Sequence, residues 1–252
     1  MRAFLAAVQC DKSALTRNLA MHVRLLEEAA RAGCDIAVFP EMSLTGSVDP
    51  RSHPEDAVAI HHDAVDELAR ATDSGVAALF GVAERSDDEF FITQICARDG
   101  RVAGSYRKRY LGEGEEGFTP GDKPALFELR REAFGVAICA EGGVDYPFSE
   151  PARAGARIVF FCAAPGLDGR RTDEAGWRDG FAWWEECGLG DAQRHARNNR
   201  VWVALTTQAG STRDEEFPGL AALVSPDGEV VARLSDWQPG TLIVDLPLSA
   251  VS

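Results

Sequence analysis

The chain contains, at residues 36–41, the run IAVFPE, in which four apolar residues are followed by a proline and a glutamate. A short continuous apolar run is typical of a strand that is buried on both faces in a parallel sheet. Upstream, apolar residues recur at helical spacing from Leu15 to Ala30, and Gly33 is suited to end that helix. The stretch therefore predicts a helix followed by a core strand, with Glu41 at the point where the strand ends.

Helical and strand patterns alternate along the rest of the chain. Ser13 is predicted to cap the first helix, and a second apolar strand, FGVAI at residues 134–138, leads directly into Cys139. Further elements are predicted at residues 4–9 (strand), 54–71 (helix), 76–82, 90–97 and 102–106 (strands), 149–154 (helix), 158–161 (strand), a long tryptophan-containing loop at 177–184, 191–199 (helix), 201–206 (strand) and a hairpin around 225–228. This alternation predicts a layered α/β fold, and since no linker or repeat divides the chain, residues 1–252 are expected to form one domain.

Composition narrows the class of protein. With 45% hydrophobic and 26% charged residues, the chain is typical of globular proteins. Its formal net charge of −14 argues against binding to nucleic acid or an anionic membrane, because both need clustered Lys and Arg. The six cysteines form no CxxC pair, and no signal peptide or bilayer-spanning apolar stretch is recognised. We therefore expect a reduced cytoplasmic protein with no disulfide framework, no zinc site and no membrane association.

Three reactive side chains follow the ends of predicted strands, namely Glu41, Lys108 and Cys139. Sites in open α/β sheets form beyond the carboxyl ends of strands, so these residues can meet. Hydrolysis of an amide by cysteine needs a nucleophile, a proton shuttle and a positive group for the oxyanion. Cys139, Glu41 and Lys108 can supply these, and the Ala140 N–H can add a second oxyanion donor. The plainer alternatives are an inert core thiol, a carboxylate that caps a turn and a solvated lysine in the basic run RKR.

The sequence resembles the nitrilase superfamily of carbon–nitrogen hydrolases, in its amidase-like branch, through four stretches that arrive in order. These are FPEMSLTG at 39–46, YRKRYL at 106–111 with FTPGD at 118–122, GVAICAE at 135–141, and residues 194–206 with FPG at 217–219 and SPDG at 225–228. The resemblance implies a four-layer αββα sandwich, a homodimer or larger homo-oligomer, and no metal or organic cofactor. It also implies a thioester on Cys139, whose hydrolysis Glu41 assists by activating water.

The resemblance leaves one assignment open in the loop after Lys108. The family often carries a second glutamate there that holds the lysine and the substrate, and Glu113, Glu115 and Glu116 are the candidates. Glu116 fits the compact Glu-Gly-aromatic-x-Pro-Gly form of aliphatic amidases and is preferred, whereas Glu115 fits if the loop has lost one residue. Glu141 resembles an acidic position of the family and is expected either to orient the substrate or to anchor the nucleophile turn.

These residues together predict a hydrolase that releases ammonia from a small linear amide, ω-amide or N-carbamoyl compound. Ala140 stands where true nitrilases commonly have tryptophan, so a nitrile substrate is less favoured. The open alternatives are a pseudoenzyme that binds a ligand in the same pocket, a nitrilase and a glutaminase subunit. The aromatic residues of segment 177–184 are expected in the core, in the pocket wall or at an oligomer interface, and His195 is expected to be a structural hydrogen-bonding residue.

Overall fold

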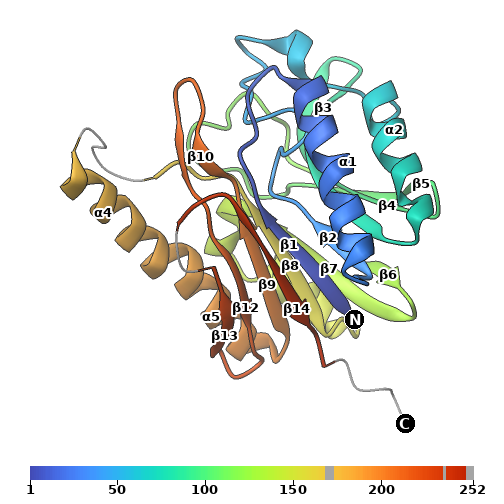
Figure 1. The fold of residues 1–252 in the computed structure, drawn as a ribbon. Coiled ribbons are helices and arrows are strands. Elements are labelled where there is room, and N and C mark those ends of the chain that lie inside the picture. The colour runs from blue at the N-terminus through green and yellow to red at the C-terminus, as the bar shows by residue number, and fades with distance from the viewer. Residues whose placement is uncertain (168–172, 235–236, 248–252) are drawn as a thin grey trace.

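The computed structural model describes residues 1–167, 173–234 and 237–247, and in them two six-stranded sheets pack face to face (Figure 1). The first sheet has the spatial order β14 (Gly240–Asp245), β1 (Arg2–Ala7), β2 (Ile36–Val38), β3 (Ala77–Ser86), β4 (Glu89–Arg98) and β5 (Arg101–Arg107). The second has the order β13 (Val230–Arg233), β12 (Ala221–Val224), β9 (Trp202–Thr207), β8 (Ile158–Ala163), β7 (Glu132–Ile138) and β6 (Phe127–Leu129). The central strands of each sheet are parallel and the outer ones antiparallel.

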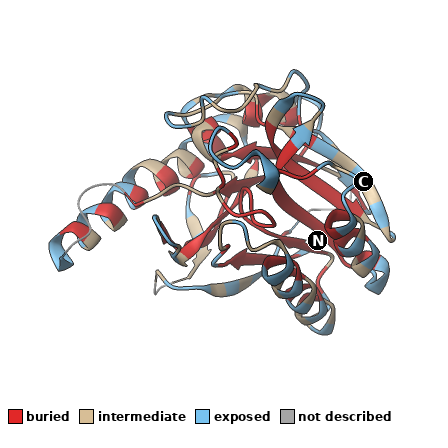
Figure 2. Ribbon diagram, turned by 90° about the horizontal axis from the view of Figure 1, so that it is seen from above, coloured by how far each residue is buried: buried red, intermediate tan, exposed pale blue. Residues whose placement is uncertain are grey.

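Helices cover the outer face of each sheet. The first sheet is covered by α1 (Leu15–Arg31) and α2 (Asp63–Ala71), and the second by α3 (Tyr146–Arg153) and α5 (Gly190–Asn199). A further helix, α4 (Glu174–Trp184), continues through a π-helical stretch (Glu185–Leu189) into α5 and extends away from the sheets (Figures 1 and 2). This arrangement confirms the predicted four-layer αββα sandwich.

The apolar strands are buried on both faces, as Figure 2 shows for the centre of the molecule. In β1, Ala3, Leu5 and Ala7 point into the layer between the sheets, while Phe4 and Ala6 face the helices. Side chains alternate between the two faces of a strand, so burial of both faces requires an unbroken apolar run. This is why strands β1, β2, β7 and β8 could be recognised from their unbroken runs of apolar residues.

Two predicted helix starts were wrong in detail. Ser13 does not cap α1, because its backbone has a φ of +58° and its hydroxyl bonds to Asp56. The helix predicted at 54–71 is a short 3-10 turn, Pro54–Asp56, followed after a break by α2. Val58, within the break, forms a bridge with Glu84 at the edge of β3, and this pairing draws the segment out of the helix.

The segment predicted as a tryptophan-containing loop is helical. Asp173 caps α4 by accepting from the N–H of Gly176 at 2.9 Å, and the helix runs on to Asn199. Glycines at 176, 180, 188 and 190 conceal this helix in the sequence, since glycine is a poor helix former.

Prediction also missed β6, β14 and the two-stranded pair β10 (Ala209–Ser211) and β11 (Glu216–Pro218). Among the described residues, no helix is long and apolar enough to cross a membrane.

Candidate active site

Lys108 is the first residue after β5, and its backbone is held on both sides. Its N–H donates to the carbonyl of Ile92 at 2.8 Å, and its carbonyl accepts from the N–H of Gly121 at 2.8 Å. The side chain is fully buried, and its ammonium donates to Glu41 Oε1 at 2.8 Å and to Glu115 Oε1 at 2.5 Å. The lysine therefore does not belong to a solvated basic face, because it points inward and bridges two carboxylates.

Glu41 follows β2 in a tight turn that packs against β3. Its side chain is only 1% exposed, and its Oε2 accepts from the backbone N–H of Ala164 at 2.9 Å. The turn approaches β3 so closely that a Cβ on Gly81 would lie 2.2 Å from the backbone nitrogen of Met42, so glycine is required there. Gln208 holds the turn from the other side by donating to the Glu41 carbonyl at 2.9 Å.

Cys139 follows β7 and begins the 3-10 turn Cys139–Gly143. Its backbone φ of +43° lies in the left-handed region, which is uncommon for a residue other than glycine. Such strained positions cluster at functional sites. The thiol is half-buried and lies on the wall of a cavity. The charges of Glu41 and Lys108 both act on its pKa. The structure thus brings together Glu41, Lys108 and Cys139.

The three groups shift one another's protonation equilibria. Burial raises the pKa of the Cys139 thiol well above its ordinary value, the Glu41 carboxylate raises it further and the Lys108 ammonium opposes both. Burial also raises the pKa of the Glu41 carboxyl, although Lys108 acts against this. Burial alone would lower the pKa of Lys108, but the charges of Glu41, Cys139 and Glu115 raise it above its usual range. These directions favour a protonated thiol, a charged lysine and a carboxylate poised to accept a proton.

The second glutamate beside the lysine is Glu115. Its Oε2 also accepts from the N–H of Gly112 at 2.6 Å, which folds the loop around the lysine. Glu116 points to solvent with 61% of its side chain exposed and pairs with Arg51 at 3.1 Å. The preference for Glu116 was therefore wrong about which glutamate contacts the lysine. The remaining candidate, Glu113, lies on the cavity wall.

Glu141 anchors the nucleophile turn. It is fully buried, and its Oε2 accepts from the N–H of Ile138 at 2.8 Å. Its Oε1 accepts from the Tyr106 hydroxyl at 2.6 Å and from the Arg109 N–H at 2.8 Å. One carboxylate thus ties the segment around Lys108 to the turn that carries the cysteine. Of the two expected roles, these contacts support the anchor, and the expected substrate contact is not supported because the buried Glu141 does not line the cavity.

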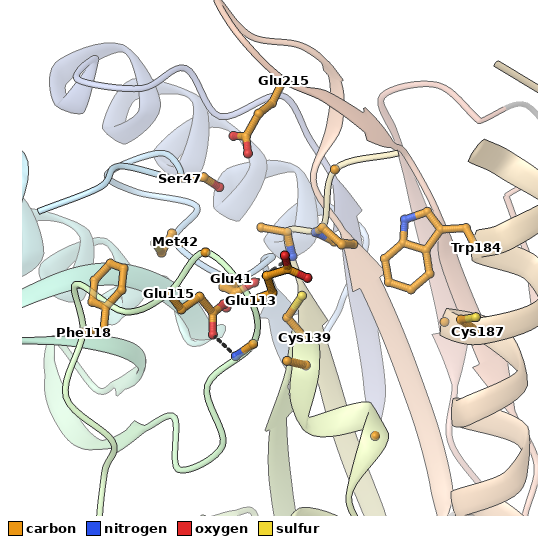
Figure 3. A pocket seen from close by; sticks show the side chains of 18 of the residues that line it. Glu41, Met42, Ser47, Glu113, Glu115, Phe118, Cys139, Trp184, Cys187 and Glu215 are labelled. Atoms are coloured by element: carbon orange, nitrogen blue, oxygen red, sulfur yellow. Dashed lines mark hydrogen bonds between the residues drawn. The ribbon is translucent and has the colours of Figure 1, made fainter. Parts of the chain in front are cut away.

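Cys139 and Glu41 open onto a cavity of about 620 Å³ (Figure 3). Ala140 also lies on its wall, where its N–H was expected to assist an oxyanion. The larger apolar side chains of the lining are Met42, Val48, Phe118, Phe161, Trp183 and Trp184. Trp183 and Trp184 therefore form part of the pocket wall, whereas Phe181 stacks on Trp237 with ring centroids 4.9 Å apart. The cavity is of a size suited to a small organic molecule.

His195 holds the nucleophile turn from the α5 side. It is 2% exposed, its Nε2 lies 2.8 Å from the carbonyl oxygen of Gly142, and its ring stacks on Phe148 with centroids 3.9 Å apart. This geometry agrees with the structural role expected from the sequence.

One group of the described residues could hold a metal ion, and it lies apart from the cavity. His53, Glu55 and Asp56 place their ligand atoms within 4.8 Å of one another at the surface. None of the three lines the cavity that contains Cys139. The group therefore has no part in the chemistry of Glu41 and Cys139.

Sequence reasoning missed Ala164, whose N–H holds Glu41. Ala164 comes directly after β8, the parallel neighbour of the strand that leads to Cys139. The rule that strand ends gather at one edge of the sheet could have identified it. Lys12 lines the cavity from the loop after β1. It was missed because no sequence pattern marks that loop position as part of a site.

Comparison with known proteins agrees with this geometry. A model of the carbon–nitrogen hydrolase family matches residues 4–252. The chain belongs to the carbon–nitrogen hydrolase family. This confirms the resemblance to the nitrilase superfamily that the ordered motifs indicated.

Individual members of the carbon–nitrogen hydrolase family are distant relatives. An omega-amidase from Xenopus tropicalis is 27% identical over 241 residues, which cover 86% of this chain and 79% of that protein. An N-carbamoylputrescine amidase from Arabidopsis thaliana is 25% identical over 94% of this chain and 83% of its own. Among solved structures, a double mutant of an amidase from Nesterenkonia sp. AN1 in complex with acrylamide matches with a TM-score of 0.83 and 23% identity, covering 98% of this chain and 91% of that one.

Proposed function

We propose that this protein hydrolyses a small linear amide, ω-amide or N-carbamoyl compound through a thioester on Cys139 and releases ammonia. The observation that carries the proposal is the fully buried Lys108 ammonium, which contacts Glu41 and Glu115 beside a half-buried thiol on the cavity wall. Burying such charges is costly, and ligand binding alone does not require them. Nucleophilic catalysis does require a base and a cation beside the thiol.

In the first half-reaction, Glu41 takes the thiol proton while the sulfur attacks the carbonyl carbon of the substrate. The raised pKa of Glu41 suits this task, since a general base works best when its pKa approaches the operating pH. The Lys108 ammonium and the Ala140 N–H stabilise the oxyanion that forms. Glu41 then gives the proton to the leaving nitrogen, the carbon–nitrogen bond breaks, and ammonia departs from the thioester.

In the second half-reaction, water attacks the thioester carbon. Glu41 accepts a proton from the water, and the same two donors stabilise the second oxyanion. The carbon–sulfur bond then breaks, the acid product leaves, and Glu41 returns its proton to the sulfur. Each proton that Glu41 accepts is thereby returned, so no cofactor or added oxidant is needed to balance the cycle.

The named relatives support the reaction class. An omega-amidase and an N-carbamoylputrescine amidase stand among them, and both names describe cleavage of carbon–nitrogen bonds. A mutant of the Nesterenkonia amidase, in which a glutamate is replaced by glutamine, carries the acetamide moiety of fluoroacetamide covalently added at its active site cysteine. The equivalent step at Cys139 is part of the proposal for this chain.

The test is ammonia release from butyramide, an N-carbamoyl amine and butyronitrile, with the wild type beside Cys139→Ala. We expect the wild type to release ammonia from at least one of the first two and the variant from none. Equal release by both proteins would refute the role of Cys139. Release from the nitrile alone would point to a nitrilase, and calorimetric binding without release would point to a binding protein.

A further inference from the structure

Lys12 is the only basic side chain among the described residues that line the cavity of Cys139. Two carboxylates already hold it, because its Nζ lies 3.0 Å from Asp214 Oδ1 and 2.8 Å from Glu215 Oε2. Its side chain is only 17% exposed. A carboxylate at the far end of a substrate would have to displace one of these partners to reach Lys12. The cavity therefore offers an anionic substrate no unoccupied cation from the described residues.

The acidic side chains of the cavity outnumber this lysine. Beyond Glu41 and Glu115, the lining includes Asp49, Glu113, Asp191 and Glu215. Three of them have ion-pair partners, Asp49 with Arg51, Asp191 with Arg194 and Glu215 with Lys12. The fourth, Glu113, makes no hydrogen bond or ion pair with any described residue. A carboxylate without a partner thus faces the space that a substrate would enter.

The rest of the lining fits an alkyl chain that ends in a cation. Met42, Val48 and Phe118 supply apolar surface on which methylene groups can lie. Trp183 also lines the cavity and is 38% exposed. Its ring offers an ammonium group a cation–π contact that an uncharged or anionic end does not make. Glu113 and Trp183 therefore favour the same charge.

We propose that this site, acting as the amidohydrolase described above, selects linear amides or carbamoyl compounds that carry an ammonium group at the end remote from the scissile bond. The amide lies at Cys139, the methylene chain follows the apolar lining, and Glu113 interacts with the ammonium. The inference rests on the proposed function for the identity of the scissile bond. The charge preference rests on the unpaired Glu113 and the neutralised Lys12.

Three primary amides test the charge preference, because each joins a carbamoyl group to four methylenes. They are 5-aminopentanamide (cationic end), hexanamide (neutral end) and adipamate (anionic end). At low salt we expect kcat/KM to be about threefold to fivefold higher for the cationic amide than for the neutral one, and lowest for the anionic one, because Glu113 is exposed and exposed charge pairs contribute little. The ratio should fall at about 0.5 M NaCl, since salt screens charges near the surface. Equal values for all three amides, or a preference for adipamate, would overturn the inference.

Glu113→Gln is the decisive variant, and Glu116→Gln is its matched control. Both replace a loop glutamate with its neutral isostere, but Glu116 is paired with Arg51 and does not line the cavity. We expect Glu113→Gln to bring the ratio for the cationic over the neutral amide close to one. Glu116→Gln should keep the wild-type ratio. If both variants changed the ratio equally, the preference would come from overall charge and Glu113 would not be its source.

Binding to Cys139→Ala separates failure of this inference from failure of the proposed function. Calorimetry with the same three amides measures the charge preference whether or not the protein hydrolyses them. Tighter binding of 5-aminopentanamide without turnover by the wild type would uphold the charge preference and refute the hydrolase. Turnover of all three amides with no difference in binding would leave the hydrolase standing and refute the charge preference.

Discussion

Replacing Glu115 with glutamine tests the correction that the structure makes to the motif. Glu115 accepts from Lys108 Nζ at 2.5 Å and from the Gly112 N–H at 2.6 Å. Glutamine keeps the size of the side chain and one acceptor oxygen but removes the negative charge beside the ammonium. A hydrogen bond to a charged group contributes roughly 1 to 2 kcal/mol more free energy than one between neutral groups. Losing the upper value in the transition state corresponds to a rate about 30-fold lower.

The loss should appear in kcat more than in KM, because in the proposed mechanism Glu115 fixes the cation that stabilises the oxyanion. A shift in the pH profile should accompany it. The charge of Glu115 raises the pKa of Glu41, so its removal lowers that pKa. The base then stays deprotonated to lower pH, and the acidic limb of kcat/KM moves toward lower pH.

The assay is ammonia release from a substrate found active in the panel above, followed as a function of pH for the wild type, Glu115→Gln and Glu116→Gln. Glu116 pairs with the exposed Arg51 and accepts from the Gly114 N–H at 2.9 Å, and glutamine keeps an oxygen that can accept this bond. Exposed pairs of this kind contribute little, so the variant should stay within about twofold of the wild type. Equal losses in both variants, or full activity in Glu115→Gln with an unmoved acidic limb, would refute the assignment.

Three further changes should separate catalysis from support. Lys108→Met should abolish ammonia release, and retained turnover would exclude the lysine from the reaction. Because it leaves the buried Glu41 and the partly buried Glu115 without their cation, it should also lower the free energy of unfolding in urea by about 3 to 5 kcal/mol. Glu141→Gln leaves buried backbone donors poorly paired and should cost about 2 to 4 kcal/mol in the same titration, and an unchanged urea midpoint would remove its anchoring role. Gly81→Ala should lower kcat by at least about tenfold, since the added methyl collides with the backbone of Met42 and shifts the turn of Glu41; a kcat equal to the wild type would show that this turn tolerates the shift.

The residues that follow core strands could be predicted from sequence, and they include the reactive ones. Lys108 and Cys139 each come directly after a strand and Glu41 follows β2 by three residues, so the apolar runs determine where these side chains start. Parallel pairing of the central strands then gathers the strand ends at one edge of each sheet. The ion pair of Lys108 with Glu41, and the influence of both charges on the Cys139 thiol, follow from this gathering of strand ends.

The loop that carries the second glutamate could not be resolved in this way. Glu113, Glu115 and Glu116 lie five, seven and eight residues after Lys108, and no apolar pattern shows which of them points inward. Gly114 has a φ of +86°, and this left-handed residue reverses the chain so that Glu115 reaches the lysine while Glu116 faces solvent. The loop predicted at residues 177–184 was wrong for a related reason, because tertiary contacts and the Asp173 cap outweigh the low helix propensity of the glycines in α4.

The two carboxylates around Lys108 have a common explanation in the charges of the proposed reaction. Before attack, the buried groups are two carboxylates, one ammonium and a neutral thiol. When the sulfur attacks, the proton moves to Glu41 and the negative charge appears on the substrate oxygen, so the net charge of the site does not change. The charge only moves from one neighbour of the ammonium to another, which requires little reorganisation of the surroundings. Glu41 loses its attraction for Lys108 at that moment, and Glu115 is then the carboxylate that still holds the ammonium in place. A single glutamate could not both serve as the base and hold the cation throughout, and this is why the site needs Glu115 most in the transition state.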